Sequence, residues 1–273
     1  MRVKRPLLGL LTAVILVLIL LPIPVLTWLS FFDQRFLAVP PTQGYTLDWY
    51  VGLLDNSRIM NGLYYSLLIA VIAAAISTIV GVLAAYGTVR GGLQGSQLVQ
   101  AIMTLPLSVP NIVLSMAIYV FLFQTGAAIG VPLGGSIYSL VAAHTVITIP
   151  WTFRLSLAGV LALKRGVERA SLDLGAGPIQ TFLKVSLPLL RSSIFASFLI
   201  AFVTSFGMLE ISLFLTSPYI TTLPVAMMQE AEHSLNPTLA AVSVIQVLIT
   251  VVMLLVLNRV FGLNKIFIGG SKE

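Results

Sequence analysis

The polar side chains that could make specific contacts gather in one stretch, residues 164–191. Five of the fifteen Lys and Arg residues of the chain lie there: Lys164, Arg165, Arg169, Lys184 and Arg191. Gly175 and Pro188 are expected to interrupt helical structure within it. A connection between two helices needs only about two to eight residues. We therefore expect this longer, charged stretch to contact another molecule.

Sequence patterns that mark an enzyme are missing. The chain has no cysteine, which excludes thiol catalysis, disulfides and thiolate metal sites. It has no GxxxxGKS or GxxxxGKT phosphate-binding loop, and no HExxH or GxSxG constellation. We therefore expect a chain that is not an enzyme, with no catalytic residue, metal site or cofactor. Any ATP that drives it has to be bound by a different subunit.

The composition indicates a helical membrane protein. Hydrophobic residues make up 58% of the chain and charged residues only 9%, whereas soluble domains carry about 25% charged residues. The apolar runs are about 20 residues long, the length that a helix needs to cross a hydrocarbon core of about 30 Å. We predict an all-α polytopic membrane protein with one transmembrane domain over residues 1–273.

Six membrane-spanning helices are predicted from the apolar runs. Their expected bounds are residues 7–32, 63–88, 98–123, 137–163, 189–215 and 238–257. Pro22 and Pro24 should kink the first span, and Pro106 and Pro110 should bend the third, because proline removes a backbone hydrogen bond. His144, inside the fourth span, is expected to be a hydrogen-bonded packing residue rather than a ligand.

The distribution of positive charge predicts the orientation of the chain. If the N-terminus is cytoplasmic and the spans alternate, thirteen of the fifteen Lys and Arg residues lie inside, and only Arg35 and Arg58 lie outside. This asymmetry is the one that cytoplasmic loops show. An even number of spans also places both termini in the cytoplasm, together with the long polar stretch between the fourth and fifth spans.

Residues 164–188 are expected to form two helices joined by a bend. Gly175 suits the left-handed backbone that ends a helix, and Pro178 suits the first turn of a second helix. Pro188 should then open the fifth span. The apolar positions of the stretch are Val167, Leu174 and Ile179. An apolar side on such a pair of helices favours docking into a groove of a partner protein.

The same stretch resembles the cytoplasmic motif of permease subunits of type I bacterial ABC importers, written EAA, three residues, Gly, nine residues, Ile, one residue, Leu-Pro. The aligned residues are Arg169-Ala170-Ser171, Gly175, Val185 and Leu187-Pro188, and Ala176 also follows the family habit. Arg169 stands where the motif has Glu, and Glu168 lies one position earlier, so the family's charged contact is made by Glu168 or is absent.

The resemblance implies a coupling role and an assembly. The residues implied to contact the ATPase subunit are Glu168, Arg169, Ala170, Ser171, Gly175, Ala176, Leu187 and Pro188. The implied partners are a second permease chain, usually related but different, two ATP-binding subunits, an extracytoplasmic solute-binding protein and membrane lipid, with no nucleic acid. The implied location is the bacterial inner membrane.

Three segments resemble the spermidine/putrescine branch of these permeases. They are RFLAVPPTQGYTLDWYVGLL, LPLSVPNIV and SFGMLEISLFLTSP. In that branch acidic residues commonly follow the Ser-Phe of the third segment, whereas here Gly207 and Met208 follow it and the acid is Glu210. The three segments together imply a polyamine as the solute, the departure at Gly207 and Met208 weakens that implication, and ferric iron or a phosphonate are the alternatives.

Glu210, Asn111 and Ser108 are the candidates for the solute pathway. A carboxylate inside a membrane costs free energy unless it is paired or hydrated, so Glu210 either faces a cation, lies at the interface or pairs with the second permease chain. Ser108 and Asn111 either line the pathway or mark a helix kink. The competing classes are a secondary transporter, which would need paired broken helices at mid-membrane, and a membrane enzyme.

Overall fold

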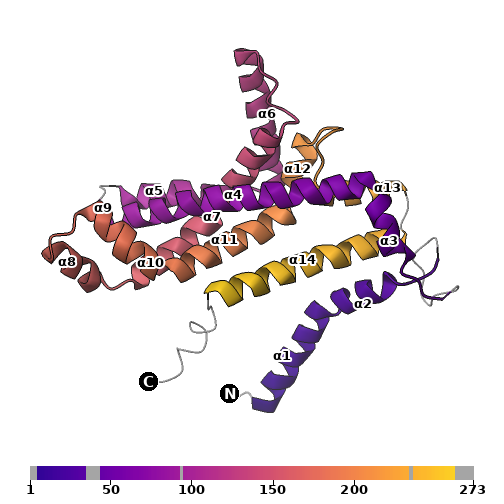
Figure 1. Cartoon of the computed structure of the whole chain (residues 1–273), viewed down its shortest axis with the longest axis horizontal. Helices are drawn as coiled ribbons and strands as arrows, with labels where there is room; N and C mark the ends of the chain where they lie inside the picture. The colour runs from indigo at the N-terminus through magenta and orange to yellow at the C-terminus, as the bar shows by residue number, and fades with distance from the viewer. Residues whose placement is uncertain (1–4, 35–43, 93–94, 234–235, 262–273) are drawn as a thin grey trace. The chain divides into compact units, whose positions relative to one another are not determined.

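The computed structural model describes residues 5–34, 44–92, 95–233 and 236–261, which are mostly helical (Figure 1). Within these ranges there is no β-strand, only an isolated antiparallel bridge between Phe32 and Tyr45. The predicted all-α fold is therefore confirmed. The elements are α1 (Arg5–Leu20), α2 (Pro22–Leu29), α3 (Asp48–Asp55), α4 (Ser57–Arg90), α5 (Ser96–Thr104), the 3₁₀ turn η1 (Leu105–Ser108), α6 (Asn111–Ile129), α7 (Ile137–Ala162), α8 (Arg165–Asp173), α9 (Pro178–Thr181), the π-helical turn η2 (Phe182–Ser186), α10 (Leu187–Leu189), α11 (Arg191–Phe206), α12 (Glu210–Leu215), α13 (Leu223–His233) and α14 (Pro237–Phe261).

The chain forms two compact units. Unit 1 comprises residues 1–60 and 226–251, and unit 2 comprises residues 61–225 and 252–273. In unit 1, polar tips of aromatic side chains fix the connection that follows α2. The indole Nε1 of Trp49 donates to the carbonyl oxygen of Phe32 at 2.7 Å, and the hydroxyls of Ser30 and Tyr50 lie 2.6 Å apart.

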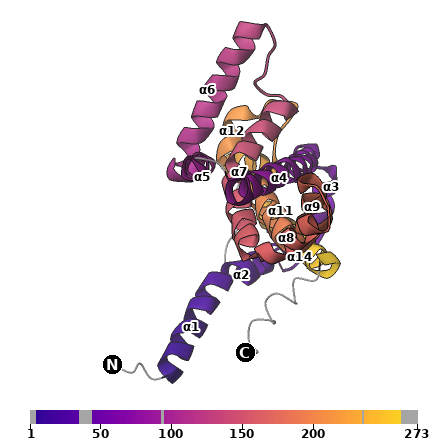
Figure 2. The same cartoon turned by 90° about the vertical axis from the view of Figure 1, so that its left-hand side faces the viewer.

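In unit 2, α7 packs against α11 on one part of its surface and against α4 on another (Figure 2). Small residues allow helix backbones to approach closely in lipid. At Gly81 of α4, an added Cβ would lie 2.8 Å from the backbone nitrogen of Phe153 in α7, and at Gly159 of α7 it would collide with Ser193 of α11. Side chains larger than hydrogen at either glycine would therefore force the helices apart.

Within the described residues, five helices are long and apolar enough to cross a membrane, and a sixth span results if one bent pair is counted as a single span. The five are Leu8–Leu29, Ser57–Arg90, Asn111–Ile129, Ile137–Ala162 and Pro237–Val256, and the bent pair is Pro178–Leu189 with Arg191–Phe206. Each corresponds to one of the six predicted spans. The first is divided into α1 and α2 next to Pro22, the site predicted for a kink.

The third predicted span, 98–123, is divided in two. Its first part is α5 and η1, which end at Ser108, and α6 begins only at Asn111. Val109 between them is extended, with ψ of 133°, because the residue before a proline avoids the helical region. The predicted bend is confirmed, but the helix that is long enough to span runs from Asn111 to Ile129.

The fifth predicted span, 189–215, differs at both ends. Pro188 does not open it, because the chain stays helical from Pro178 to Leu189 and then bends by 70° into α11. A proline ring collides with the carbonyl four residues earlier in a regular α-helix. The wider π turn η2, in which the N–H of Leu187 bonds to the carbonyl of Phe182, lies just before Pro188 and accommodates the ring. At its other end α11 stops at Phe206, before a break.

Candidate functional site

The polar stretch between α7 and α11, residues 164–188, is called the coupling segment below. It folds as α8, a turn, and α9 continuous with η2, at the end of unit 2 where α4 ends (Figures 1 and 2). α8 ends at Asp173 and α9 begins at Pro178, so both predicted helix boundaries are confirmed. Gly175 has φ of +89°, the left-handed conformation expected of a glycine that caps a helix.

The turn after α8 is closed by two backbone hydrogen bonds. The N–H of Gly175 donates to the carbonyl of Leu172 at 2.9 Å, and the N–H of Ala176 donates to that of Ser171 at 3.1 Å. This is the paired pattern of the Schellman cap. A further hydrogen bond of 3.0 Å joins the hydroxyls of Ser171 and Thr181, so α8 and α9 are tied together on both sides of the turn.

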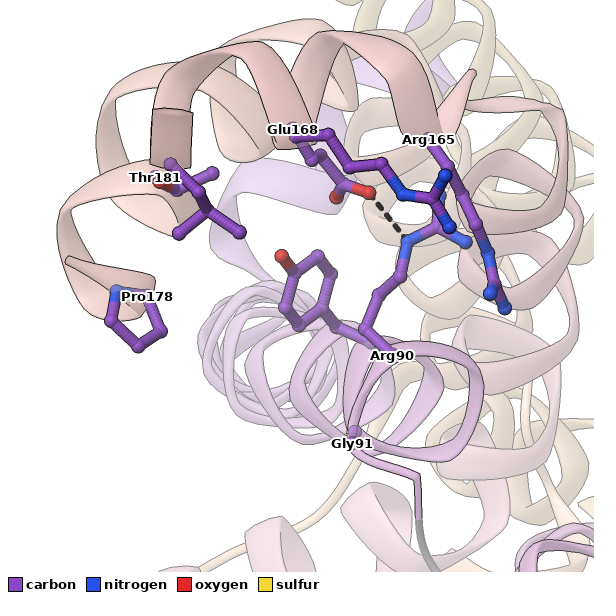
Figure 3. Close-up of a pocket in the computed structure, with 10 residues that line it drawn as sticks. Arg90, Gly91, Arg165, Glu168, Pro178 and Thr181 are labelled. Atoms are coloured by element: carbon purple, nitrogen blue, oxygen red, sulfur yellow. Dashed lines mark hydrogen bonds and ion pairs between the residues drawn. The ribbon is translucent and has the colours of Figure 1, made fainter. Parts of the chain in front are cut away.

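A buried ion pair fastens the coupling segment to the end of α4 (Figure 3). The Nε of Arg90 donates to Oε2 of Glu168 at 2.6 Å, and only 6% of Glu168 is exposed. The Nη2 of Arg90 also donates to the carbonyls of Val160 and Leu163, at 3.2 and 2.8 Å. One guanidinium therefore joins the last turn of α4, the last turn of α7 and the first turn of α8.

The second carboxylate oxygen of Glu168 is also engaged. The hydroxyl of Ser186 in η2 donates to Oε1 of Glu168 at 2.8 Å and lies 3.3 Å from the hydroxyl of Tyr86 in α4. The ring of Tyr86 contacts that of Phe182, with centroids 4.6 Å apart. A buried carboxylate needs a charge partner and further hydrogen bonds. Glu168 has both, so its carboxylate faces the interior of this chain.

Three members of this network were missing from the predicted site: Arg90, Tyr86 and Ser186. Arg90 is 78 residues from Glu168, and its short polar turn after the second span resembles an ordinary membrane flank. The only signal in the sequence was that an acidic residue such as Glu168 needs a partner if the fold buries it.

The other predicted coupling residues lie at the surface or beside it. Arg169 and Ala170 are exposed, Gly175 and Pro188 are exposed, and Ser171, Ala176 and Leu187 are half-buried. The apolar residues of the segment are conspicuously uncovered. Val167 is 45% exposed, Leu174 89% and Ile179 75%. The apolar side predicted for docking is therefore free of contacts that would bury it within the described chain.

A cleft of about 420 Å³ opens between the end of α4 and the coupling segment. Figure 3 shows Arg165 and Arg90 on one side of it and Thr181 and Pro178 on the other. The Nη2 of Arg165 donates to the carbonyl of Val89 at 3.3 Å, a second link between α8 and α4. The cleft is thus bordered by α4, α8 and α9, and the ion pair connects the first two of these.

The three candidate pathway residues lie at helix breaks. Ser108 ends η1, Asn111 begins α6 and Glu210 begins α12. Ser108 and Asn111 are exposed and Glu210 is half-buried. Neither cleft beside α6 is lined by any of the three. Among the described residues Glu210 has no ion-pair partner, and no group of three His, Asp or Glu side chains could hold a metal ion.

These features define a polytopic membrane protein with a folded polar segment between two spans. Residues 77–263 match the family described as the binding-protein-dependent transport system inner membrane component. The chain belongs to this family. It is therefore a membrane permease component of a bacterial ABC importer, and the ATPase of such a system is a separate subunit.

Two curated relatives are polyamine permeases of Escherichia coli (strain K12). The putrescine transport system permease protein PotI is 29% identical over 223 residues, which cover 81% of this chain and 79% of that protein. The spermidine/putrescine transport system permease protein PotC is 25% identical over 235 residues, which cover 86% of each. The predicted resemblance to this branch is therefore confirmed.

The fold also has a counterpart among solved structures. It is similar to a chain from a bacterial ABC transporter involved in the import of the acidic polysaccharide alginate. The TM-score is 0.74 at 17% identity, over 92% of this chain and 93% of that one. At this identity the likeness shows a shared fold and leaves the solute open.

Proposed function

We propose that this chain forms one half of the pathway of an ATP-driven importer, and that its coupling segment docks into an ATP-binding subunit. The observation that carries the proposal is the exposure of Leu174 and Ile179 next to the cap at Gly175. Apolar residues exposed together outside the membrane mark an interaction surface. A capped pair of short helices has the shape of a peptide that fills a groove on a partner.

The ion pair between Arg90 and Glu168 gives such docking a mechanical consequence. Because it joins α8 to the ends of α4 and α7, a force applied to the coupling segment is transmitted to two spans. ATP-driven closure of the two partner subunits would then shift the population between inward-open and outward-open states. In this proposal Glu168 positions the segment, and the contact with the partner falls to exposed residues such as Arg169 and Leu174.

Loss of the exposed apolar side tests the docking. Leu174→Ser together with Ile179→Ser should lower the amount of ATP-binding subunit that co-purifies with this chain, without changing its insertion. Leu54→Ser is the matched control, because Leu54 is 71% exposed in α3, on a segment assigned to the outer face. Undiminished co-purification of the double variant would exclude the docking role.

We propose a polyamine, such as putrescine or spermidine, as the solute. The support is the similarity to PotI and PotC and the carboxylate of Glu210, which has no ion-pair partner within the described part of the chain and suits a cation. The alternatives, ferric iron and a phosphonate, stay open because one fold of this kind serves an anionic polysaccharide. Uptake of labelled putrescine, ferric iron and a phosphonate by the complete complex in liposomes distinguishes them, and a binding screen on the cognate binding protein identifies the solute directly.

The remaining partners are proposed from the family and from the predicted orientation. They are a second, different permease chain, two ATP-binding subunits and an extracytoplasmic binding protein, with both termini of this chain in the cytoplasm. Mass measurement of the purified complex gives the subunit composition. If the chain moves solute in liposomes without an ATP-binding subunit, it is a secondary transporter and the importer proposal is wrong.

A further inference from the structure

The fifth span is broken in the middle of an apolar core. α11 ends at Phe206 and α12 begins at Glu210. The turn between them is tightened by a hydrogen bond from the N–H of Met208 to the carbonyl of Ser205, at 3.2 Å. A cluster of buried apolar residues from α4, α7, α12 and the break itself lies here: Ile69, Leu140, Ala143, Ile147, Met208, Ile211 and Leu215. Polar groups in such surroundings need protein partners, since unpaired ones are costly.

A single histidine of α7 bridges this break. Nδ1 of His144 lies 2.8 Å from the hydroxyl of Ser205, in the last turn of α11. Nε2 of the same ring lies 3.1 Å from the hydroxyl of Ser212, in the first turn of α12. His144 is only 2% exposed. Its ring thus contacts both half-helices at once, and the prediction that it is a hydrogen-bonded packing residue is confirmed.

The hydrogen bonds assign the proton on the ring. The hydroxyl of Ser212 donates its one proton to the carbonyl of Met208 at 3.0 Å, so it accepts from Nε2–H of His144. Nδ1 is then the bare nitrogen and accepts from the hydroxyl of Ser205. The result is an unbroken series of three hydrogen bonds from α11, through α7 and α12, to the turn that separates the half-helices.

We propose that His144 is a positioning residue that pins α12 to α11 across the break and thereby holds Glu210 in place at the solute pathway. Glu210 is two residues from Ser212 in the same short helix, so a change in the direction of α12 moves both. The role of Glu210 in this statement rests on the proposed function. The pinning of the two half-helices rests on the contacts alone.

The pinning is tested by a distance that needs no solute. The chain has no cysteine, so within it spin labels attach only at the introduced Ile200→Cys in α11 and Leu213→Cys in α12. The distance between the two labels reports the angle across the break. Both positions are partly exposed, at 37% and 39%. In the complete complex, His144→Leu should broaden the distance distribution, and His144→Gln, which keeps a donor and an acceptor, should restore most of it. An unchanged distribution in His144→Leu overturns the proposal.

A second measurement tests the link to Glu210. Uptake of labelled putrescine should show a KM raised by roughly tenfold in His144→Leu, the loss expected for one or two hydrogen bonds. In a Glu210→Gln background the same substitution should leave KM unchanged. Equal effects in both backgrounds would overturn the action through Glu210. Failure of the wild-type complex to take up putrescine would instead count against the proposed solute, while the label distances still decide the pinning.

Two further variants separate positioning from folding. Thr148→Val removes a buried hydroxyl that bonds within α7, to the carbonyl of His144, and does not reach the break. It should leave the label distances unchanged. If His144→Leu proves too unstable, adding Ser205→Ala and Ser212→Ala replaces all the polar partners with apolar groups, which can be nearly neutral for stability. The label distances should stay broad in that stable variant, and narrow distances there would overturn the proposal.

Discussion

Glu168 lies in the first turn of α8, and its carboxylate is 2.6 Å from the Nε of Arg90 in the last turn of α4. The sequence motif suggested that this acid contacts the ATPase subunit or that the contact is absent. Its carboxylate is instead turned into the chain, where Ser186 occupies its other oxygen. The coupling segment is therefore attached to α4 through Glu168, the acid one position before the place where the motif has its Glu.

Removing one member of the pair should be more harmful than removing both. Glu168→Ala leaves the half-buried guanidinium of Arg90 without its charge partner, and the cost should lie below the about 3–5 kcal/mol of a fully buried pair. The double variant Arg90→Ala with Glu168→Ala should recover part of that loss. Thermal unfolding of the detergent-solubilised complex measures both. The control is Arg165→Ala, which removes an exposed arginine with one bond to a carbonyl. If the stability lost in the double variant equals the sum of the losses in Arg90→Ala and Glu168→Ala, the two residues do not interact.

A β-branched residue at Gly175 should uncouple ATP hydrolysis from uptake. The left-handed backbone there costs a residue other than glycine about 1–2 kcal/mol, so Gly175→Val should open the cap and move the exposed side of the segment. Gly177→Ala is the control, because Gly177 has φ of −73° and, like Gly175, has nothing within 4 Å of an added Cβ. The ratio of ATP hydrolysed to solute imported is the measurement. An unchanged ratio in Gly175→Val would remove the cap from the coupling mechanism.

Loss of the carboxylate in the fifth span should weaken uptake of a cation. Glu210→Gln keeps the size of the side chain and removes its charge, so KM for labelled putrescine should rise if the residue faces the solute. Glu232→Gln makes the same change at an exposed position in α13 and should leave KM unchanged. Normal uptake kinetics in Glu210→Gln would exclude the residue from the pathway.

Side chains at the close approach of α4 and α7 should destabilise unit 2. Gly81→Val places carbon atoms where a Cβ alone would already lie 2.8 Å from the backbone of α7, and overpacking of this kind costs about 1–3 kcal/mol. Gly87→Ala in the same helix meets nothing within 4 Å and should be neutral or stabilising. The midpoint of thermal unfolding reports both. Equal midpoints for Gly81→Val and wild type would mean that α4 and α7 can separate without cost.

Local signals allowed much of the coupling segment to be predicted. Gly175 and Pro178 determine backbone geometry within a few residues, so the end of α8 and the start of α9 could be predicted from spacing. Pro188 was a misleading signal, because a π turn next to it let the helix continue to Leu189. Phe182, the first residue of the π turn, packs its ring against Tyr86 of α4, a contact between distant parts of the chain that no local pattern predicts.

The contacts that hold the site were beyond a sequence reading. Arg90 and Glu168 are separated by 78 residues, and His144 is 61 and 68 residues from its two serine partners. Glu168 and His144 were singled out from the sequence, whereas Arg90 and the two serines were not. Only the fold determines which polar side chains meet in an apolar interior. The break after Phe206 was likewise hidden within an apolar run that reads as one continuous span.

The separation of Arg90 from Glu168 also constrains the order in which the protein can be completed during synthesis. The ribosome makes Arg90 78 residues before its partner, which takes roughly 4–16 seconds at about 5–20 residues per second. During this interval the second span is already available for insertion, while its terminal arginine has neither the carboxylate nor the α7 carbonyls to bind. The end of α4 that carries Arg90 therefore matures only after the fourth span and the start of the coupling segment have been translated.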